Sequence, residues 1–141
     1  MKLLRVGNKE NEKPAILDKE NKIRDLSSII EDFNPSTLND LLIDKINNLN
    51  LSELPEISNK ERIGSCVSKP GKFIAIGLNY SDHAAETGSK VPTEPIIFMK
   101  ATSSICGPND NIEIVSGSKK LDWEVELGVI IGKEAKHISE K

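Results

Sequence analysis

The sequence predicts an α+β protein that is mainly β, with a small N-terminal α+β domain over residues 1–62 and a second, strand-rich domain over 63–141. Short apolar or alternating runs bounded by turn residues recur along the chain, and such runs are typical of strands. One stretch, 38–49, instead has the i, i+3, i+4, i+7 spacing of an amphipathic helix. The composition changes at residue 63, after a connector rich in Leu, Pro, Glu and Asn, and this change places the domain boundary.

Composition and charge exclude several classes of protein. The 141 residues are 37% hydrophobic and 29% charged, which is typical of a folded globular protein. The net charge of −3, with no Lys/Arg cluster among aromatic residues, argues against nucleic-acid binding. The apolar start stops at Gly7, too early for a signal peptide, and no apolar run is long enough to cross a bilayer. Cys66 and Cys106 form no CxxC pattern, so we expect reduced thiols in a cytoplasmic protein without a membrane partner.

The first 62 residues predict a structural module. Three short apolar runs are expected to be strands, the last two of them paired as a hairpin: 2–6, 14–18 and 22–26. Pro35 then separates a possible helical turn from the amphipathic helix at 38–49, which Ser36 or Thr37 can cap. We expect residues 50–62 to be an irregular connector. No residue of this module is a candidate for catalysis.

The second domain begins with an apolar run at 72–78 that predicts a buried strand, and a second strand is predicted at 95–100. A short helix is expected between them. Ser81 or Asp82 can cap its start, and Gly88 can end it.

His83 and Glu86 lie three residues apart on this predicted helix and therefore share a face. An imidazole beside a carboxylate is a general-base arrangement, because the acid orients the ring and stabilises its protonated form. The same spacing also fits an exposed ion pair without a catalytic role.

The stretch 121–127 alternates acidic and apolar residues, which predicts a strand with one acidic face, and it continues into the apolar run 128–131. Asp122, Glu124 and Glu126 share that face. Like charges in a row repel unless they are compensated, and a hard divalent cation such as Mg²⁺ prefers carboxylate oxygens. The pattern therefore fits either a metal site or the solvated face of an edge strand.

Five stretches, in this order, resemble the fumarylacetoacetate hydrolase (FAH) family: Ile76-Gly77-Leu78-Asn79-Tyr80, His83-Ala84-Ala85-Glu86, Pro95-Ile96-Ile97-Phe98-Met99-Lys100, Gly107-Pro108-Asn109-Asp110 and Asp122-Trp123-Glu124-Val125-Glu126-Leu127. More narrowly, they look like bacterial members similar to ureidoglycolate lyase or 2-hydroxyhepta-2,4-diene-1,7-dioate isomerase. The resemblance covers roughly residues 63–138. Residues 1–62 look like the small amino-terminal domain of the shorter members.

The resemblance implies a mixed β-sheet roll around a Mg²⁺ or Mn²⁺ site, usually in a homodimer. Glu124 and Glu126 match the two metal-ligating glutamates of the family. His83 and Glu86 match the dyad that activates water or moves a proton, and Lys100 is a weaker match on the substrate side of the pocket.

The implied chemistry is that of a metal-dependent enzyme acting on a small 2-keto or diketo acid. The cation would chelate the carboxylate and carbonyl oxygens of the acid and stabilise an enolate, while His83 takes a proton. C–C hydrolysis, decarboxylation and isomerisation share this enolate, and ureidoglycolate cleavage is implied by the bacterial lyases, so the site does not select among them.

The family's third acidic ligand would lie beyond Lys141, so we expect this chain to be the amino-terminal part of a longer protein, with an incomplete catalytic domain. The alternative function is that of a truncated, catalytically incompetent fragment that acts at most as a binding or dimerisation piece.

Overall fold

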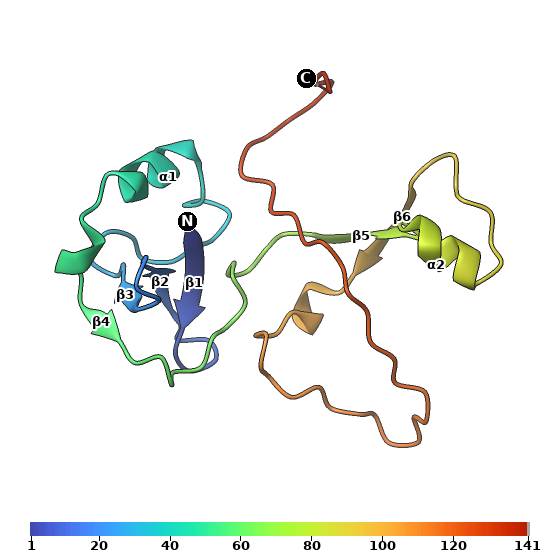
Figure 1. Cartoon of the computed structure of the whole chain (residues 1–141), viewed down its shortest axis with the longest axis horizontal. Coiled ribbons are helices and arrows are strands. Elements are labelled where there is room, and N and C mark those ends of the chain that lie inside the picture. The colour runs from blue at the N-terminus through green and yellow to red at the C-terminus, as the bar shows by residue number, and fades with distance from the viewer. Residues whose placement is uncertain (141) are drawn as a thin grey trace. The chain divides into compact units, whose positions relative to one another are not determined.

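A computed structural model describes residues 1–140, which form two compact units (Figure 1). One unit contains Met1–Ser68 together with the chain from Cys106 onward, and the other is Lys69–Ile105. The predicted boundary between residues 62 and 63 stays a prediction. Among the described residues, no helix is long and apolar enough to cross a membrane.

The first unit is built on a four-stranded antiparallel sheet. Its strands lie in chain order: β1 (Lys2–Val6), β2 (Lys13–Leu17), β3 (Ile23–Asp25) and β4 (Glu56–Ile57). The predicted hairpin is confirmed, and its turn is closed by Asp18, whose Oδ1 accepts hydrogen bonds from the backbone N–H groups of Glu20 and Lys22 at 2.8 and 2.9 Å. The expectation of an irregular connector at 50–62 is wrong, because β4 pairs with β3 there, after a 3₁₀ turn at Leu51–Glu53.

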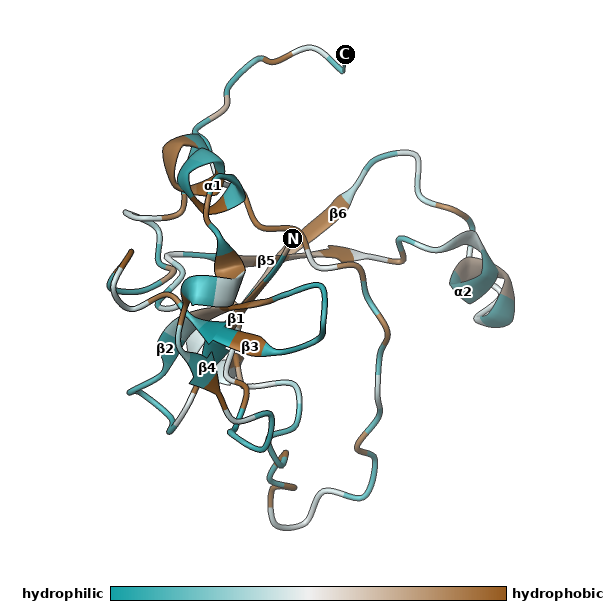
Figure 2. Cartoon of the chain, turned by 60° about the vertical axis from the view of Figure 1, so that its left-hand side comes forward, coloured by the Kyte–Doolittle hydropathy of each residue, from teal (hydrophilic) through white to brown (hydrophobic). Residues whose placement is uncertain are grey.

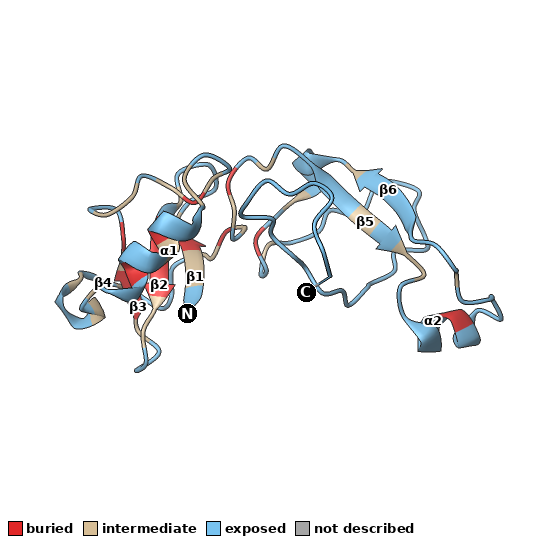
Figure 3. Ribbon diagram, turned by 90° about the horizontal axis from the view of Figure 1, so that it is seen from above, coloured by how far each residue is buried: buried red, intermediate tan, exposed pale blue. Residues whose placement is uncertain are grey.

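The alternation of side chains along the strands gives this sheet two buried faces. On β2, Ala15 and Ile16 are exposed by only 0% and 3% and belong to different clusters. The cluster around Ile16 is completed by residues from the loop after β3 and from helix α1: Leu26, Phe33, Leu42 and Ile46. The cluster around Ala15 contains Val6 and Ile23. Figure 3 shows these buried positions gathered in the sheet and helix of the first unit.

Helix α1 (Asp40–Asn47) is shorter than the predicted 38–49, and its cap differs from the predicted one. Asn39 caps it, because its Oδ1 accepts from the Leu42 N–H at 3.0 Å. Ser36 and Thr37 are instead held by the side chain of Asn34, in a turn that precedes the helix.

The second unit contains a two-stranded antiparallel ribbon and a short helix. Strands β5 (Phe73–Gly77) and β6 (Ile96–Lys100) pair along their full length, and α2 (Ser81–Glu86) lies in the connection between them. The predicted cap of the helix is wrong, because Tyr80 occupies the N-cap position and Ser81 and Asp82 already lie inside the helix. The predicted end of the helix is confirmed. Gly88 has a φ of +66°, and the N–H groups of Gly88 and Ser89 donate to the carbonyls of Ala85 and Ala84 at 3.1 and 2.8 Å. This is a Schellman motif, which favours glycine at the left-handed position.

The prediction of a buried strand at 72–78 is wrong in its burial. Ile74 and Ile97 lie on the two strands of the ribbon and are exposed by 51% and 65%. Figure 2 shows the ribbon as strongly hydrophobic, and Figure 3 shows it as mostly exposed. Apolar strands are buried only when another layer covers them, and within the Lys69–Ile105 unit the paired strands have no second sheet layer on either face.

The prediction of a strand at 121–131 is also wrong for this structure. Within the described chain, residues 111–140 contain no helix or strand. The apolar side chains of this alternating stretch, which a strand would bury, are exposed: Trp123 by 80% and Leu127 by 82%. A strand forms by hydrogen bonding to a neighbour, and among the described residues no strand lies in register with this segment.

Candidate functional site

The structure places His83 and Glu86 on one turn of α2, as the sequence predicts. Both residues are exposed, whereas Ala84, on the opposite side of the helix, is buried. Asp82 and Thr87 stabilise the ends of the helix: Asp82 Oδ1 accepts from the His83 N–H at 2.9 Å, and the Thr87 hydroxyl donates to the His83 carbonyl at 3.0 Å. The helix therefore presents an imidazole and a carboxylate on the surface of the Lys69–Ile105 unit.

Lys100 is the last residue of β6 and lies opposite Phe73 on β5. Residues paired directly across an antiparallel ribbon share a face. Lys100 therefore lies at the end of an apolar face that includes Phe73 and Phe98, and it is half-buried there.

Glu124 and Glu126 lie in the irregular segment of the first unit, with exposed side chains. Their carboxylate oxygens are the ligands that Mg²⁺ and Mn²⁺ prefer, so the donor chemistry fits the implied metal. Within residues 1–140, however, no group of three or more His, Cys, Asp or Glu side chains is arranged to hold a metal ion. Two of the candidate donors thus lie two residues apart on one segment, and the described residues do not assemble a complete ligand set.

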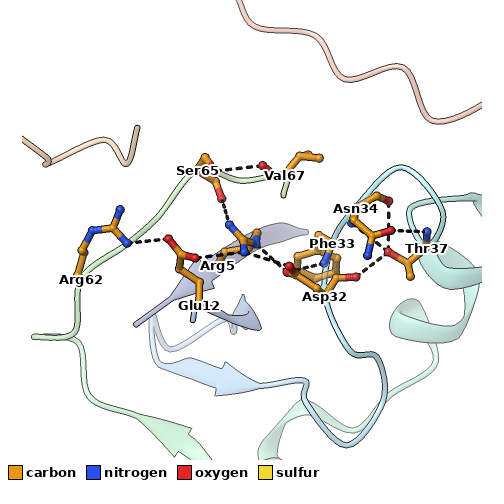
Figure 4. A network of polar contacts seen from close by, with 9 residues as sticks. All are labelled: Arg5, Glu12, Asp32, Phe33, Asn34, Thr37, Arg62, Ser65 and Val67. Carbon is orange, nitrogen blue, oxygen red and sulfur yellow. Dashed lines mark hydrogen bonds and ion pairs between the residues drawn. The ribbon is translucent and has the colours of Figure 1, made fainter. Parts of the chain in front are cut away.

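A network of charged side chains, which the sequence analysis missed, lies in the module that was expected to carry no function (Figure 4). Arg5 on β1 is exposed by only 6%, and its guanidinium contacts Asp32 through two hydrogen bonds of 2.6 and 3.0 Å. It also contacts Glu12 at 3.2 Å. Glu12 in turn accepts from Arg62 at 2.8 Å. Buried charges need such partners, because an unpaired ion would lose its hydration without compensation.

Arg62 extends this network to a turn at residues 107–110. Its Nε and Nη2 both donate to the carboxylate of Asp110 at 2.7 Å, and its Nη1 donates to Glu12 and to the Gly7 carbonyl at 2.8 and 3.1 Å. The pair lies beside an open hollow of about 520 Å³, lined by residues 59–63 and 109–111. Alternating charges therefore run without interruption from Asp32 to Asp110.

The network shifts the titration of its acids. The hydrogen bond from Arg62, aided by the Gly107 N–H, lowers the pKa of Asp110 to about 2. Burial raises the pKa of Glu12, but the hydrogen bond from Arg62 and the positive charges of Arg5 and Arg62 outweigh it, so this pKa lies below its ordinary value. Both acids are therefore ionised at neutral pH, and the alternating charges persist.

We expect Asp110→Asn to reduce the acid sensitivity of this unit. Asp110 has a folded pKa of about 2, against an ordinary value of 3.8. Its stabilising effect is therefore present above about pH 4 and is lost as the pH falls toward 2. Urea unfolding followed by circular dichroism, between pH 5 and 2, should show the two proteins converging in stability as the pH falls. Parallel curves over this range would contradict the assignment.

The chain is similar to known proteins over its second half in one comparison and over nearly its whole length in another. Residues 72–141 match the family model described as fumarylacetoacetate (FAA) hydrolase, C-terminal. Over 140 residues, the chain is 54% identical to a "Putative hydrolase" of Burkholderia ambifaria and to another of Burkholderia multivorans, and it covers 50% of each. The alignment includes 99% of this chain, which therefore spans about half the length of the curated relatives it matches.

A solved structure is also similar. It is the crystal structure of a "putative HpcE protein" from Mycobacterium smegmatis, with a TM-score of 0.65 and 27% sequence identity. The similarity covers 84% of this chain and 42% of that one. The range of the family match contains every residue of the predicted site: His83, Glu86, Lys100, Glu124 and Glu126.

Proposed function

We propose that this chain, whose residues 72–141 match the model of the fumarylacetoacetate hydrolase family, is the amino-terminal part of a divalent-metal-dependent enzyme of that family for a small 2-keto or diketo acid. The family match over the segment that contains all five candidate residues carries this proposal. The fold agrees with it, since the chain is a mainly β, α+β protein that spans half of its relatives. In the whole protein, the segment 63–141 would form part of a mixed β-sheet roll.

Each candidate residue has a distinct role in this proposal. Glu124 and Glu126 would hold Mg²⁺ or Mn²⁺ through their carboxylates. An ion bound there would supply Lewis acidity toward the carbonyl oxygen of the substrate. His83 takes a proton from water or from the substrate carbon, and Glu86 orients its ring and stabilises the imidazolium. Lys100 pairs with the substrate carboxylate at the apolar border of the ribbon.

The relatives' names favour hydrolysis among the reactions that this site allows, because the Burkholderia proteins are described as hydrolases. Hydrolysis of a C–C bond beside the carbonyl uses each of the residues above, with His83 activating water. Decarboxylation, isomerisation and ureidoglycolate cleavage use the same groups. A homodimer in the cytoplasm is part of the same proposal.

The second candidate function is that of an inactive piece that binds or dimerises. The exposure of Trp123, at 80%, and the irregular course of residues 111–140 favour it, because an acidic segment without a paired strand holds its carboxylates less firmly. The two functions differ in one property that is easily measured: whether the acidic segment binds a divalent cation.

We expect Mn²⁺ to change the fluorescence of Trp123 in a saturable way that EDTA reverses, because this single tryptophan adjoins Glu124. Glu124→Ala and Glu126→Ala should each abolish the change and, in the protein extended to the length of its relatives, the metal-dependent turnover of a 2,4-diketo acid. Glu134→Ala is the matched control, since Glu134 is an exposed acid of the same irregular segment. Turnover by Glu126→Ala at saturating Mg²⁺ equal to that of the parent would show that Glu126 is not a ligand.

A further inference from the structure

The chain leaves the amino-terminal sheet for the Lys69–Ile105 unit at a firmly held point. The backbone at 62–64 continues along β1, since the Gly7 N–H donates to the Arg62 carbonyl at 2.8 Å and the Gly64 N–H donates to the Arg5 carbonyl at 2.7 Å. Four residues later, the Ser68 N–H donates to the carbonyl of the core residue Phe33 at 2.7 Å. Ser68 itself is exposed by only 9%. The departing end of the chain is therefore part of the module.

The chain returns from that unit to the same place. Gly107 is buried, and a Cβ there would collide with the Ile63 carbonyl oxygen and would lie 3.2 Å from the Gly64 Cα. Only glycine allows two backbones to approach this closely. The turn is closed by Asp110, whose Oδ2 accepts from the Gly107 N–H at 2.7 Å, while its own N–H donates to the Gly107 carbonyl at 3.1 Å. Turn 107–110 is thus packed directly on residues 63 and 64.

One side chain joins this turn to the sheet. Arg62 is the residue that contacts both the buried Glu12 and the Asp110 carboxylate, and it uses its whole planar fork to do so. A lysine has a single point of charge and does not reproduce a bidentate contact on one side together with a third bond on the other. We call these three residues, Glu12, Arg62 and Asp110, the clasp.

We propose that Arg62 is a positioning residue: through the clasp it holds the returning end of the Lys69–Ile105 segment, at Gly107, against the amino-terminal module. His83, Glu86 and Lys100 lie on this segment. Fixing the ends of a segment removes many of the conformations that it can adopt. The clasp therefore fixes the point at which the segment that carries these three side chains rejoins the module. Its consequence for turnover rests on the proposed function, whereas the clasp itself does not.

The clasp is tested by amide hydrogen exchange on the full chain and on Arg62→Gln, Arg62→Lys and Asp110→Asn. We expect the amides of Gly107 and Asp110 to exchange about tenfold faster in Arg62→Gln and Asp110→Asn, because a partly exposed, charge-assisted contact is lost. Arg62→Lys should restore only part of the protection. The amides of β1 and β2 should stay as in the parent, which shows that the module remains folded.

Arg24→Gln is the matched control. Arg24 also lies in the module and contacts Asp18 at 2.7 Å, but it makes no contact with the clasp. Its loss should leave Gly107 and Asp110 protected. Parent-like exchange at these two amides in both Arg62→Gln and Asp110→Asn would overturn the proposal. Equal loosening in Arg24→Gln would also overturn it, since the effect would then be general destabilisation. Asp110→Asn keeps the test open if Arg62→Gln fails to fold.

Activity separates this inference from the proposed function. In the protein extended to the length of its relatives, kcat for a 2,4-diketo acid should be lower in Arg62→Gln than in the parent, and Arg24→Gln should keep the parental kcat. A parent without metal-dependent turnover would refute the proposed function, while the exchange data would still decide the clasp. Faster exchange with unchanged kcat would confine Arg62 to a structural role and overturn its positioning role.

Discussion

His83→Ala is expected to lower the turnover of a 2-keto or 2,4-diketo acid by about 10²–10⁴, the usual contribution of a positioned general base. His83 is the imidazole of α2, one turn from the carboxylate of Glu86. The proposed metal ligands lie on a different segment, so the affinity for Mn²⁺ should stay unchanged. Steady-state kinetics at saturating Mn²⁺, with the Trp123 titration alongside, measures both properties on the protein extended to the length of its relatives.

Asp82→Asn provides the matched control for this change. Asp82 precedes His83 on the same short helix and is exposed, and its side chain contacts only the adjacent backbone. We expect its turnover to stay within a few-fold of the parent. A loss of Mn²⁺ affinity in His83→Ala would contradict the general-base assignment and would make the imidazole a ligand instead.

Phe33→Ala is expected to destabilise the amino-terminal module by about 3–5 kcal/mol, the usual cost of removing a buried aromatic ring. Phe33 is exposed by only 1% and packs among Ile16, Leu26 and Ile46. The removal of the ring leaves a cavity. Because the core contains only a few large side chains, they cannot repack to fill that cavity. Urea unfolding followed by circular dichroism measures the loss.

Leu41→Ala is the control for this stability prediction. Leu41 lies on α1 but is exposed by 80%, so its truncation removes little buried surface and should change stability by no more than about 0.5 kcal/mol. A smaller effect for Phe33→Ala than for Leu41→Ala would show that the core is centred elsewhere. Leu41 belongs to the apolar spacing that predicts the helix at 38–49, but the structure places its side chain on the exposed side of α1.

The residues of the candidate site could be predicted from the sequence because they lie in short motifs. His83 and Glu86 are three apart on a helix whose glycine end follows from local chemistry, and the structure contains that helix, although its N-cap is Tyr80 and not the predicted Ser81 or Asp82. Glu124 and Glu126 are two apart, and their acidic character is independent of the fold. The family match covers the same segment. The roles of these residues stay predictions, because catalysis depends on distances between segments.

The clasp could not be predicted from the sequence in the same way. Arg62 and Asp110 are separated by 48 positions, and neither belongs to a local pattern that distinguishes it from an ordinary surface charge. Glu12 follows a polar turn and resembles a solvated residue in the sequence, yet its side chain is exposed by only 6%. The only available signal was Arg5, a charge inside a strand otherwise rich in apolar residues. Such a residue indicates a buried partner without identifying it.

The sequence by itself determined the local elements: β1, the hairpin of β2 and β3, the helix that ends at Gly88, and the strand before residue 100. Each depends on periodicity, capping or turn chemistry over a few residues, and these forces act within the segment itself. Tertiary structure alone decided which elements are buried and which charges meet. The β2 strand is covered on both faces, whereas the equally apolar β5 is not, and the alternating run at 121–127 forms no strand. Burial and strand pairing require a partner surface, and no local pattern contains that information.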